Sequence, residues 1–182
     1  MKIFCIGFNK TGTVSLHKAL SELGYRGIHG LWKNHKNVEK AISENKPLLN
    51  YFDNNITHFS DLDIIKDNYK LLDKQYPNSK FILNTRNKES WLVSRKKHYN
   101  DYLNNKNNGK YHNGWRWVKE SESDWSKEWD KHHEEVIEYF KNRPEDFLIV
   151  DIPSGDGYNK LCPFLGKELL GRKFPRLNVT KK

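Results

Sequence analysis

The sequence predicts an α/β fold in which helices cover both faces of a central parallel sheet, giving three layers. Three continuous apolar runs, Lys2–Phe8, Lys80–Thr85 and Phe147–Ile152, are typical of strands buried on both faces. Segments with apolar residues at helical spacing lie between and after these runs. Strands that alternate with helices form parallel sheets, because each crossover helix packs onto a face of the sheet.

Helical spacing and turn residues define the remaining elements. The predicted helices are one from Thr13 to a stop at Gly24, Val38–Glu44, Leu62–Gln75, one that begins at Trp91, Trp115–Phe140 and Gly157–Leu165. The run Thr57–Asp61 indicates a short strand end, and residues Gly24–Asn55 show a mixed pattern. Asn100–Gly114 has no period and predicts an exposed loop or lid. The tail from Gly171 is basic and extended.

Length and composition limit the class of protein. We expect residues 1–182 to form a single domain, with about residues 100–126 as a candidate lid or acceptor-binding insertion. The net charge of +9 favours an anionic ligand, such as a nucleotide, a nucleic acid, a membrane surface or an acidic glycan. The 2 cysteines exclude a disulfide scaffold and a cysteine-rich zinc site. No apolar segment fits a signal peptide or a membrane span, so we expect a soluble, cytoplasmic protein.

The loop after the first strand is the first candidate site, since ligands of open α/β folds bind beyond the carboxyl ends of the strands. It reads Gly7-Phe8-Asn9-Lys10-Thr11-Gly12-Thr13-Val14-Ser15 and leads into a helix start, where backbone N–H groups favour an anion. Its two glycines have the separation of a Walker A loop. However, Thr13 and Val14 stand where that loop needs Lys and then Ser or Thr, so the arrangement that holds magnesium is missing and we expect no metal requirement.

A second candidate anion site follows the second long strand. Arg86 comes directly after that strand, and Ser94 stands eight residues later in the predicted helix. A guanidinium offers paired donors to a phosphate, and a hydroxyl adds a neutral donor. An arginine in this place is more commonly part of a surface salt bridge. Together with the first loop, however, it indicates the second half of a site for a nucleotide with two phosphate groups.

The run from Lys10 to Ser15 resembles the 5′-phosphosulfate loop of sulfotransferases that use 3′-phosphoadenosine-5′-phosphosulfate (PAPS), with Val14 in place of the usual second Thr. Arg86 and Ser94 resemble the 3′-phosphate pair of that family. Tyr76–Leu83 and Phe147–Phe164 are similar to small sulfotransferase-like proteins of microbes and viruses. The resemblance implies the P-loop-like sulfotransferase fold, PAPS as donor and adenosine 3′,5′-bisphosphate as product.

The resemblance also implies roles for single residues. Lys10 would contact the bridging oxygen or the sulfuryl group and act in catalysis, and two basic residues of the tail would close over the 3′-phosphate, although a solvated basic tail is an equal alternative. The implied cofactor-binding residues are Lys10, Thr11, Gly12, Thr13, Val14, Ser15, Arg86, Ser94, Arg172 and Lys173.

Sulfuryl transfer needs positioning, charge stabilisation and a general base for the acceptor. The candidates for the base are Asp61, His58, Asp53 and His29. We favour Asp61, which also resembles the Asp of the family at this point. Capping of the following helix is the structural alternative for Asp61, and His58 is the alternative base.

Two other functions remain open at this level, a nucleotide-dependent kinase of the P-loop type and a non-catalytic basic nucleic-acid-binding domain. We expect a nucleotide sulfate donor and a glycan or small-molecule acceptor as partners, without a membrane or nucleic acid. His132-His133-Glu134-Glu135 lacks the spacing of a zinc motif. The tryptophans at 115, 117, 125 and 129 fit core or lid packing, or an acceptor pocket.

Overall fold

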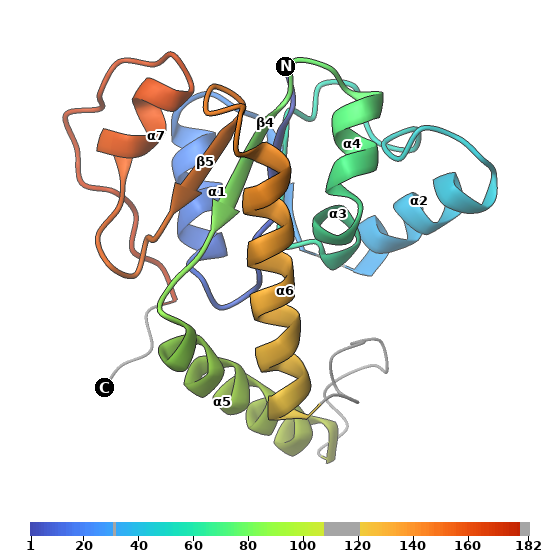
Figure 1. The fold of residues 1–182 in the computed structure, drawn as a ribbon, viewed down its shortest axis with the longest axis vertical. Coiled ribbons are helices and arrows are strands. Elements are labelled where there is room, and N and C mark those ends of the chain that lie inside the picture. The colour runs from blue at the N-terminus through green and yellow to red at the C-terminus, as the bar shows by residue number, and fades with distance from the viewer. Residues whose placement is uncertain (31, 108–120, 179–182) are drawn as a thin grey trace. The chain divides into compact units, whose positions relative to one another are not determined.

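The computed structural model describes residues 1–30, 32–107 and 121–178, which form two compact units (Figure 1). The first unit consists of Met1–Thr85 and Arg143–Lys182, and the second consists of Arg86–Asn142. That the whole chain forms a single domain stays a prediction. In the described ranges no helix is both long and apolar enough to cross a membrane, and a cytoplasmic location likewise stays a prediction.

The first unit contains a five-stranded sheet in which every paired neighbour is parallel, with the order β2-β3-β1-β4-β5. The predicted α/β fold with a parallel sheet is therefore confirmed. The strands are β1 (Ile3–Cys5), β2 (Gly27–His29), β3 (His58–Ser60), β4 (Lys80–Asn84) and β5 (Phe147–Val150). Strand β2 was not anticipated, because its three residues include only one large apolar side chain.

The two faces of the sheet carry different packing, because side chains alternate along each strand. On one face, Ile3, Cys5 and Ile82 form a buried cluster with residues of α1 (Thr13–Glu22) and α7 (Tyr158–Phe164). On the other face, the Phe4 ring lies 5.6 Å from Phe59 and 5.3 Å from Phe81, measured between ring centroids. This alternation places helices on both faces of the first unit.

The helices on the second face begin with α2 (Trp32–Ser43), which is longer than predicted. The single helix predicted for Leu62–Gln75 is two helices, α3 (Asp63–Asp67) and α4 (Tyr69–Gln75). The break falls at Asn68, whose side-chain amide donates to the carbonyl oxygen of Ile64 at 2.7 Å. Asparagine interrupts helices in this way because its side chain competes for backbone groups.

The second unit is a pair of helices, α5 (Lys88–Asn107) and α6 (Glu122–Phe140). The Ser121 hydroxyl accepts from the Asp124 backbone N–H at 3.2 Å, and the Asp124 carboxylate accepts from Ser121, so a capping box starts α6. The prediction of a loop from Asn100 is wrong for residues 100–107, which continue α5. Within this segment the Tyr102 side chain is buried, which an exposed loop would not provide. The rest of that loop, and residues 108–120 of the candidate lid, lie outside the described residues.

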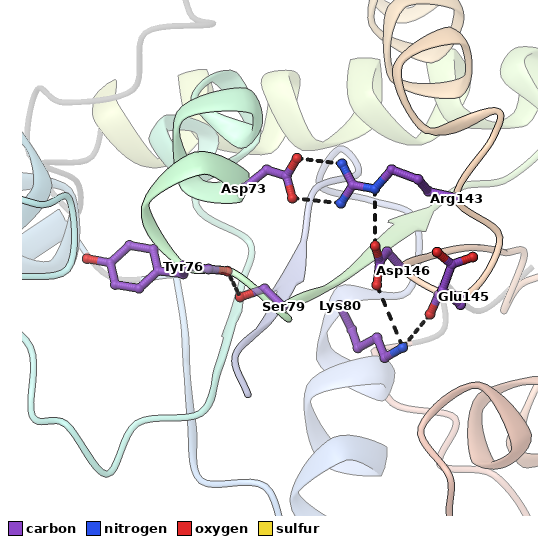
Figure 2. A network of polar contacts seen from close by, with 7 residues as sticks. All are labelled: Asp73, Tyr76, Ser79, Lys80, Arg143, Glu145 and Asp146. Carbon is purple, nitrogen blue, oxygen red and sulfur yellow. Dashed lines mark hydrogen bonds and ion pairs between the residues drawn. The ribbon is translucent and has the colours of Figure 1, made fainter.

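A polar network links the starts of two strands at the edge opposite to their carboxyl ends (Figure 2). The Arg143 guanidinium donates twice to the Asp73 carboxylate of α4, at 2.6 and 2.8 Å, and its Nε donates to Asp146 at 3.1 Å. Lys80, the first residue of β4, pairs with Asp146 at 3.9 Å and donates to the carbonyl oxygen of Glu145. The network thereby joins α4 to the beginnings of β4 and β5.

Candidate functional site

The loop between β1 and α1 is held by one buried side chain, that of Asn84 at the end of β4. Its Oδ1 accepts from the Gly7 backbone N–H at 3.1 Å, and its Nδ2 donates to the Phe8 carbonyl oxygen at 3.2 Å and to the Thr11 hydroxyl at 2.6 Å. Asn84 is fully buried, so water does not compete for these bonds. The amide therefore fixes the shape of the loop from a strand that lies far away in the sequence.

The loop also depends on two glycines. A Cβ at Gly7 would lie 1.9 Å from the Asn84 carbonyl oxygen, a distance that no side chain tolerates. Gly12 has a φ of +88°, and a Cβ there would lie 3.2 Å from Ile152. Lys10 itself has a φ of +63°, which places it in the left-handed region that most residues avoid. The backbone path around Lys10 is therefore imposed by its surroundings.

The start of α1 carries backbone donors without a side-chain cap. Gly12 is the N-cap, no side chain caps the helix, and the first turn contains no acidic residue. The N–H groups of the first turn have no acceptor within the helix, and the helix dipole is positive at this end. Of the residues here, Thr13 and Ser15 are buried and Val14 is half-buried. An anion at this point would satisfy donors that the helix leaves open.

Two hydroxyls of the predicted phosphate loop take part in structural bonds. The Thr11 hydroxyl donates to the Phe8 carbonyl oxygen at 2.6 Å and accepts from Asn84, so its hydroxyl proton is used within the loop. The Ser15 hydroxyl accepts from the Leu177 backbone N–H at 2.9 Å, which brings the tail onto the start of α1. The Ser15 hydroxyl proton is used in no hydrogen bond among the residues described, whereas that of Thr11 is.

Asp61 follows β3 and lies where the charge of Lys10 acts on it. Its φ is +58°, and its side chain is 26% exposed. Burial raises the pKa of the Asp61 carboxyl to about 6, with a further contribution from Asp63, while Lys10 and His35 oppose the rise. The N-cap of α3 is Leu62, without a side-chain cap. Asp61 therefore does not cap the helix, and its raised pKa suits a general base near neutral pH.

His58 is fully buried, with its Nε2 2.8 Å from Nδ1 of His17 on α1. Burial, together with the neighbouring His17, lowers the pKa of His58 to about 3. A Cβ at Gly27 would lie 2.1 Å from the His58 ring, so the ring occupies the space above that glycine. This enclosed position favours Asp61 over His58 as the base. Asp53 faces Arg26 at 3.7 Å with both side chains well exposed, and gains no support.

The second unit contains Arg86 and Ser94. Arg86 Nε donates to the Ser90 hydroxyl at 3.0 Å. At the start of α5, the Asn87 side-chain oxygen accepts from the Ser90 backbone N–H at 3.0 Å. Ser90 and Ser94 are four residues apart and lie on the same face of the helix. The structure thus joins Arg86 to Ser90, a residue that sequence spacing did not indicate.

The tail contacts both ends of α1. Arg172 Nε lies 3.5 Å from the carboxylate of Glu22, the last residue of α1, about 13 Å along the helix from its start. Lys173 is exposed. The tail reaches the first turn of α1 at Leu177, whereas Arg172 lies at the other end of that helix. The sequence alone does not indicate the roles of Asn84, His17 and Leu177, because none of them belongs to a local motif.

Among the residues that the structure describes, no group of three or more His, Cys, Asp and Glu side chains is arranged to hold a metal ion. A family model described as a sulfotransferase domain matches residues 2–182 of the chain. The curated proteins contain no match to the chain. The resemblance noted from the Lys10 loop is therefore confirmed over nearly the whole chain.

Proposed function

Since the chain belongs to the sulfotransferase domain family and is thus a transferase, we propose that it moves the sulfuryl group of PAPS to a hydroxyl or amine of an acceptor. We further propose that this acceptor is a glycan or a small molecule. The observation that carries the proposal is the loop after β1. It presents a lysine and an uncapped helix start at the carboxyl edge of the sheet, in a shape that Asn84 and two glycines impose.

The residues of the loop fit the phosphate end of such a donor. The open N–H groups of Thr13, Val14 and Ser15 would hold the 5′-phosphate, and the buried Ser15 hydroxyl would add a donor. Gly12 leaves the space for close approach of the backbone. Arg86 and Ser94 would bind the 3′-phosphate. The bond from Arg86 to Ser90, which lies one helical turn before Ser94, supports this assignment.

The donor supplies an activated sulfuryl group, whose bond to the bridging oxygen breaks with the electron pair leaving on the bisphosphate. Lys10 stabilises the negative charge that develops on this leaving group. Asp61 accepts the proton that the acceptor's hydroxyl or amine loses as its oxygen or nitrogen bonds to sulfur. Because the charge of Lys10 acts on Asp61, leaving-group stabilisation and proton removal take place at the same edge of the sheet.

The test is transfer of radiolabelled sulfate from PAPS to a panel of glycans, phenols and amines. We expect Lys10→Ala to lower kcat strongly, by about 100-fold or more, with a smaller loss of affinity for adenosine 3′,5′-bisphosphate. Arg86→Ala should weaken that affinity most. Lys18→Ala removes an exposed lysine of α1 as the matched control and should change neither value. Equal effects of the Lys10 and Arg86 variants on both values would contradict the assigned roles.

A further inference from the structure

We propose that His29 is the positioning residue of Asp61: its Nε2–H faces the carboxylate, orients it and favours its ionised form. The proposal rests on the proposed function in one respect, namely that Asp61 serves as the base. The pairing of the strands creates the contact. His29 ends β2 opposite Ser60 of β3, so Asp61 is the next residue at the same edge of the sheet.

The geometry of the pair supports a direct interaction. His29 Nε2 lies 3.6 Å from Asp61 Oδ2, with the two side chains 22% and 26% exposed. That nitrogen is buried and has no hydrogen-bond partner among the residues described. Hydrogen bonds of active sites are often long without substrate and shorten in the complex. A buried, unpartnered nitrogen opposite a carboxylate oxygen is arranged for such a bond.

The backbone around the pair is held in place. The Gly30 N–H donates to the Ser60 carbonyl oxygen at 3.0 Å, which continues the pairing of the strands beyond His29. The buried Asn34 side chain donates to the Gly30 carbonyl oxygen at 2.6 Å. Gly30 has a φ of +55°, and a Cβ there would lie 3.7 Å from Asp61 Oδ2. The turn that follows His29 therefore passes directly beside the carboxylate.

A second histidine restricts the His29 ring. The ring of His17 on α1 has its centroid 5.3 Å from that of His29 and 4.8 Å from that of His58. His17 in turn is fixed by its 2.8 Å bond to the buried His58. The three rings thus form a packed row from the interior to Asp61, and His29 is its outermost member.

Protonation determines what His29 can do for Asp61. Burial lowers the pKa of His29, so the ring is neutral at neutral pH and carries one N–H. With that proton on Nε2, a donor faces the Asp61 carboxylate. In the other tautomer an unprotonated Nε2 would face the carboxylate oxygen, which places one acceptor against another. The remaining charges that act on Asp61 are Lys10 and His35, which favour ionisation, and Asp63, which opposes it. His29 adds a neutral donor to this set.

The test that does not depend on activity is an NMR titration of the Asp61 side-chain carboxyl carbon, assigned with Asp61→Asn. In His29→Phe, which removes the donor, we expect the Asp61 pKa to rise by roughly 0.5–1 unit. In His29→Gln, whose amide N–H replaces the imidazole donor, we expect a value close to that of the unmodified protein. An unchanged pKa in folded His29→Phe overturns the proposal. If His29→Phe does not fold, His29→Ala replaces it under the same criterion.

The kinetic readout is the pH profile of transfer. In His29→Phe the acidic limb of kcat should move to higher pH, and kcat should fall between about tenfold and a hundredfold. Affinity for adenosine 3′,5′-bisphosphate should stay unchanged, and His29→Gln should recover most of the loss. The positioning role is overturned if kcat falls in His29→Phe while the acidic limb of its pH profile stays in place, and if His29→Gln does not recover kcat. Absence of transfer in the unmodified protein refutes the proposed function instead, while the titration still decides on the pair.

Discussion

Asp61 combines three features that rarely coincide in one residue. Its backbone lies in the left-handed region, its carboxyl is mostly buried, and its pKa is raised to about 6. The left-handed backbone costs stability through steric strain. The buried carboxylate costs stability because it loses the hydration that an exposed aspartate keeps, and this cost appears as the raised pKa. Costs of this kind are typical of functional sites. These costs support the proposed role of Asp61 as the general base.

We predict that Asp61→Asn stabilises the protein at about pH 7.5 by on the order of 2 kcal/mol while transfer is lost. The substitution removes a desolvated charge, and asparagine tolerates a positive φ as well as aspartate does. Unfolding in urea measures the change, with the well-exposed Asp53→Asn as control. A destabilised Asp61→Asn protein would show that the carboxylate holds the fold together.

At the scale of elements, the sequence predicts most of what is local and little of what depends on pairing. The Lys10 loop and the helix after it follow from a single run of residues. Strand β2 exists because Gly27–His29 pairs with β3, and three residues carry too little periodicity to show this. The row of His17, His29 and His58 comes from three separate elements, so no spacing along the chain reveals it.

Asn84 is the clearest case of a long-range role at this scale. We predict that Asn84→Ala destabilises the protein by about 2–3 kcal/mol, because it leaves the buried Gly7 N–H without its acceptor and removes the bonds to the Phe8 carbonyl oxygen and the Thr11 hydroxyl. It should also weaken binding of adenosine 3′,5′-bisphosphate, since the loop loses its support. Thermal melts with and without the nucleotide measure both effects, and the exposed Asn142→Ala is the control. Unaltered nucleotide binding would separate Asn84 from the site.

We expect the polar network at the opposite edge to contribute to stability and not to nucleotide binding. Arg143→Ala breaks the paired bonds to Asp73 and the bond to Asp146, and burial of the group is only partial. We expect a loss of about 1–2 kcal/mol, without an effect on nucleotide affinity. Denaturant unfolding and calorimetry measure the two quantities, and Lys141→Ala, on a nearby exposed side chain, is the comparison. A loss of nucleotide affinity in Arg143→Ala would contradict this separation of the two edges.

At the scale of the whole molecule, the buried histidines set how stability depends on pH. The pKa of His58 falls to about 3 on folding, and those of His17 and His29 also fall. Below about pH 6.5 the unfolded chain binds more protons at these residues than the folded chain does, so stability decreases. Asp61 acts in the opposite direction, because the folded state takes up its proton first as the pH falls through 6.

We predict that the free energy of unfolding decreases on acidification below about pH 6.5, because three histidines outweigh one carboxyl. His58→Gln removes the largest of these shifts, and its stability should vary less with pH over the same range. Urea unfolding at a series of pH values measures the slope, which is independent of any packing cost of the substitution. Parallel pH profiles for the two proteins would exclude His58 as a source of the dependence.

The most direct test of the account is calorimetric binding of adenosine 3′,5′-bisphosphate, with adenosine 5′-monophosphate and ATP–Mg²⁺ titrated under the same conditions. We predict that the bisphosphate binds at least about tenfold more tightly than either of the other nucleotides. Binding of ATP–Mg²⁺ together with no detectable binding of the bisphosphate would contradict the assignment of the Lys10 loop and of Arg86.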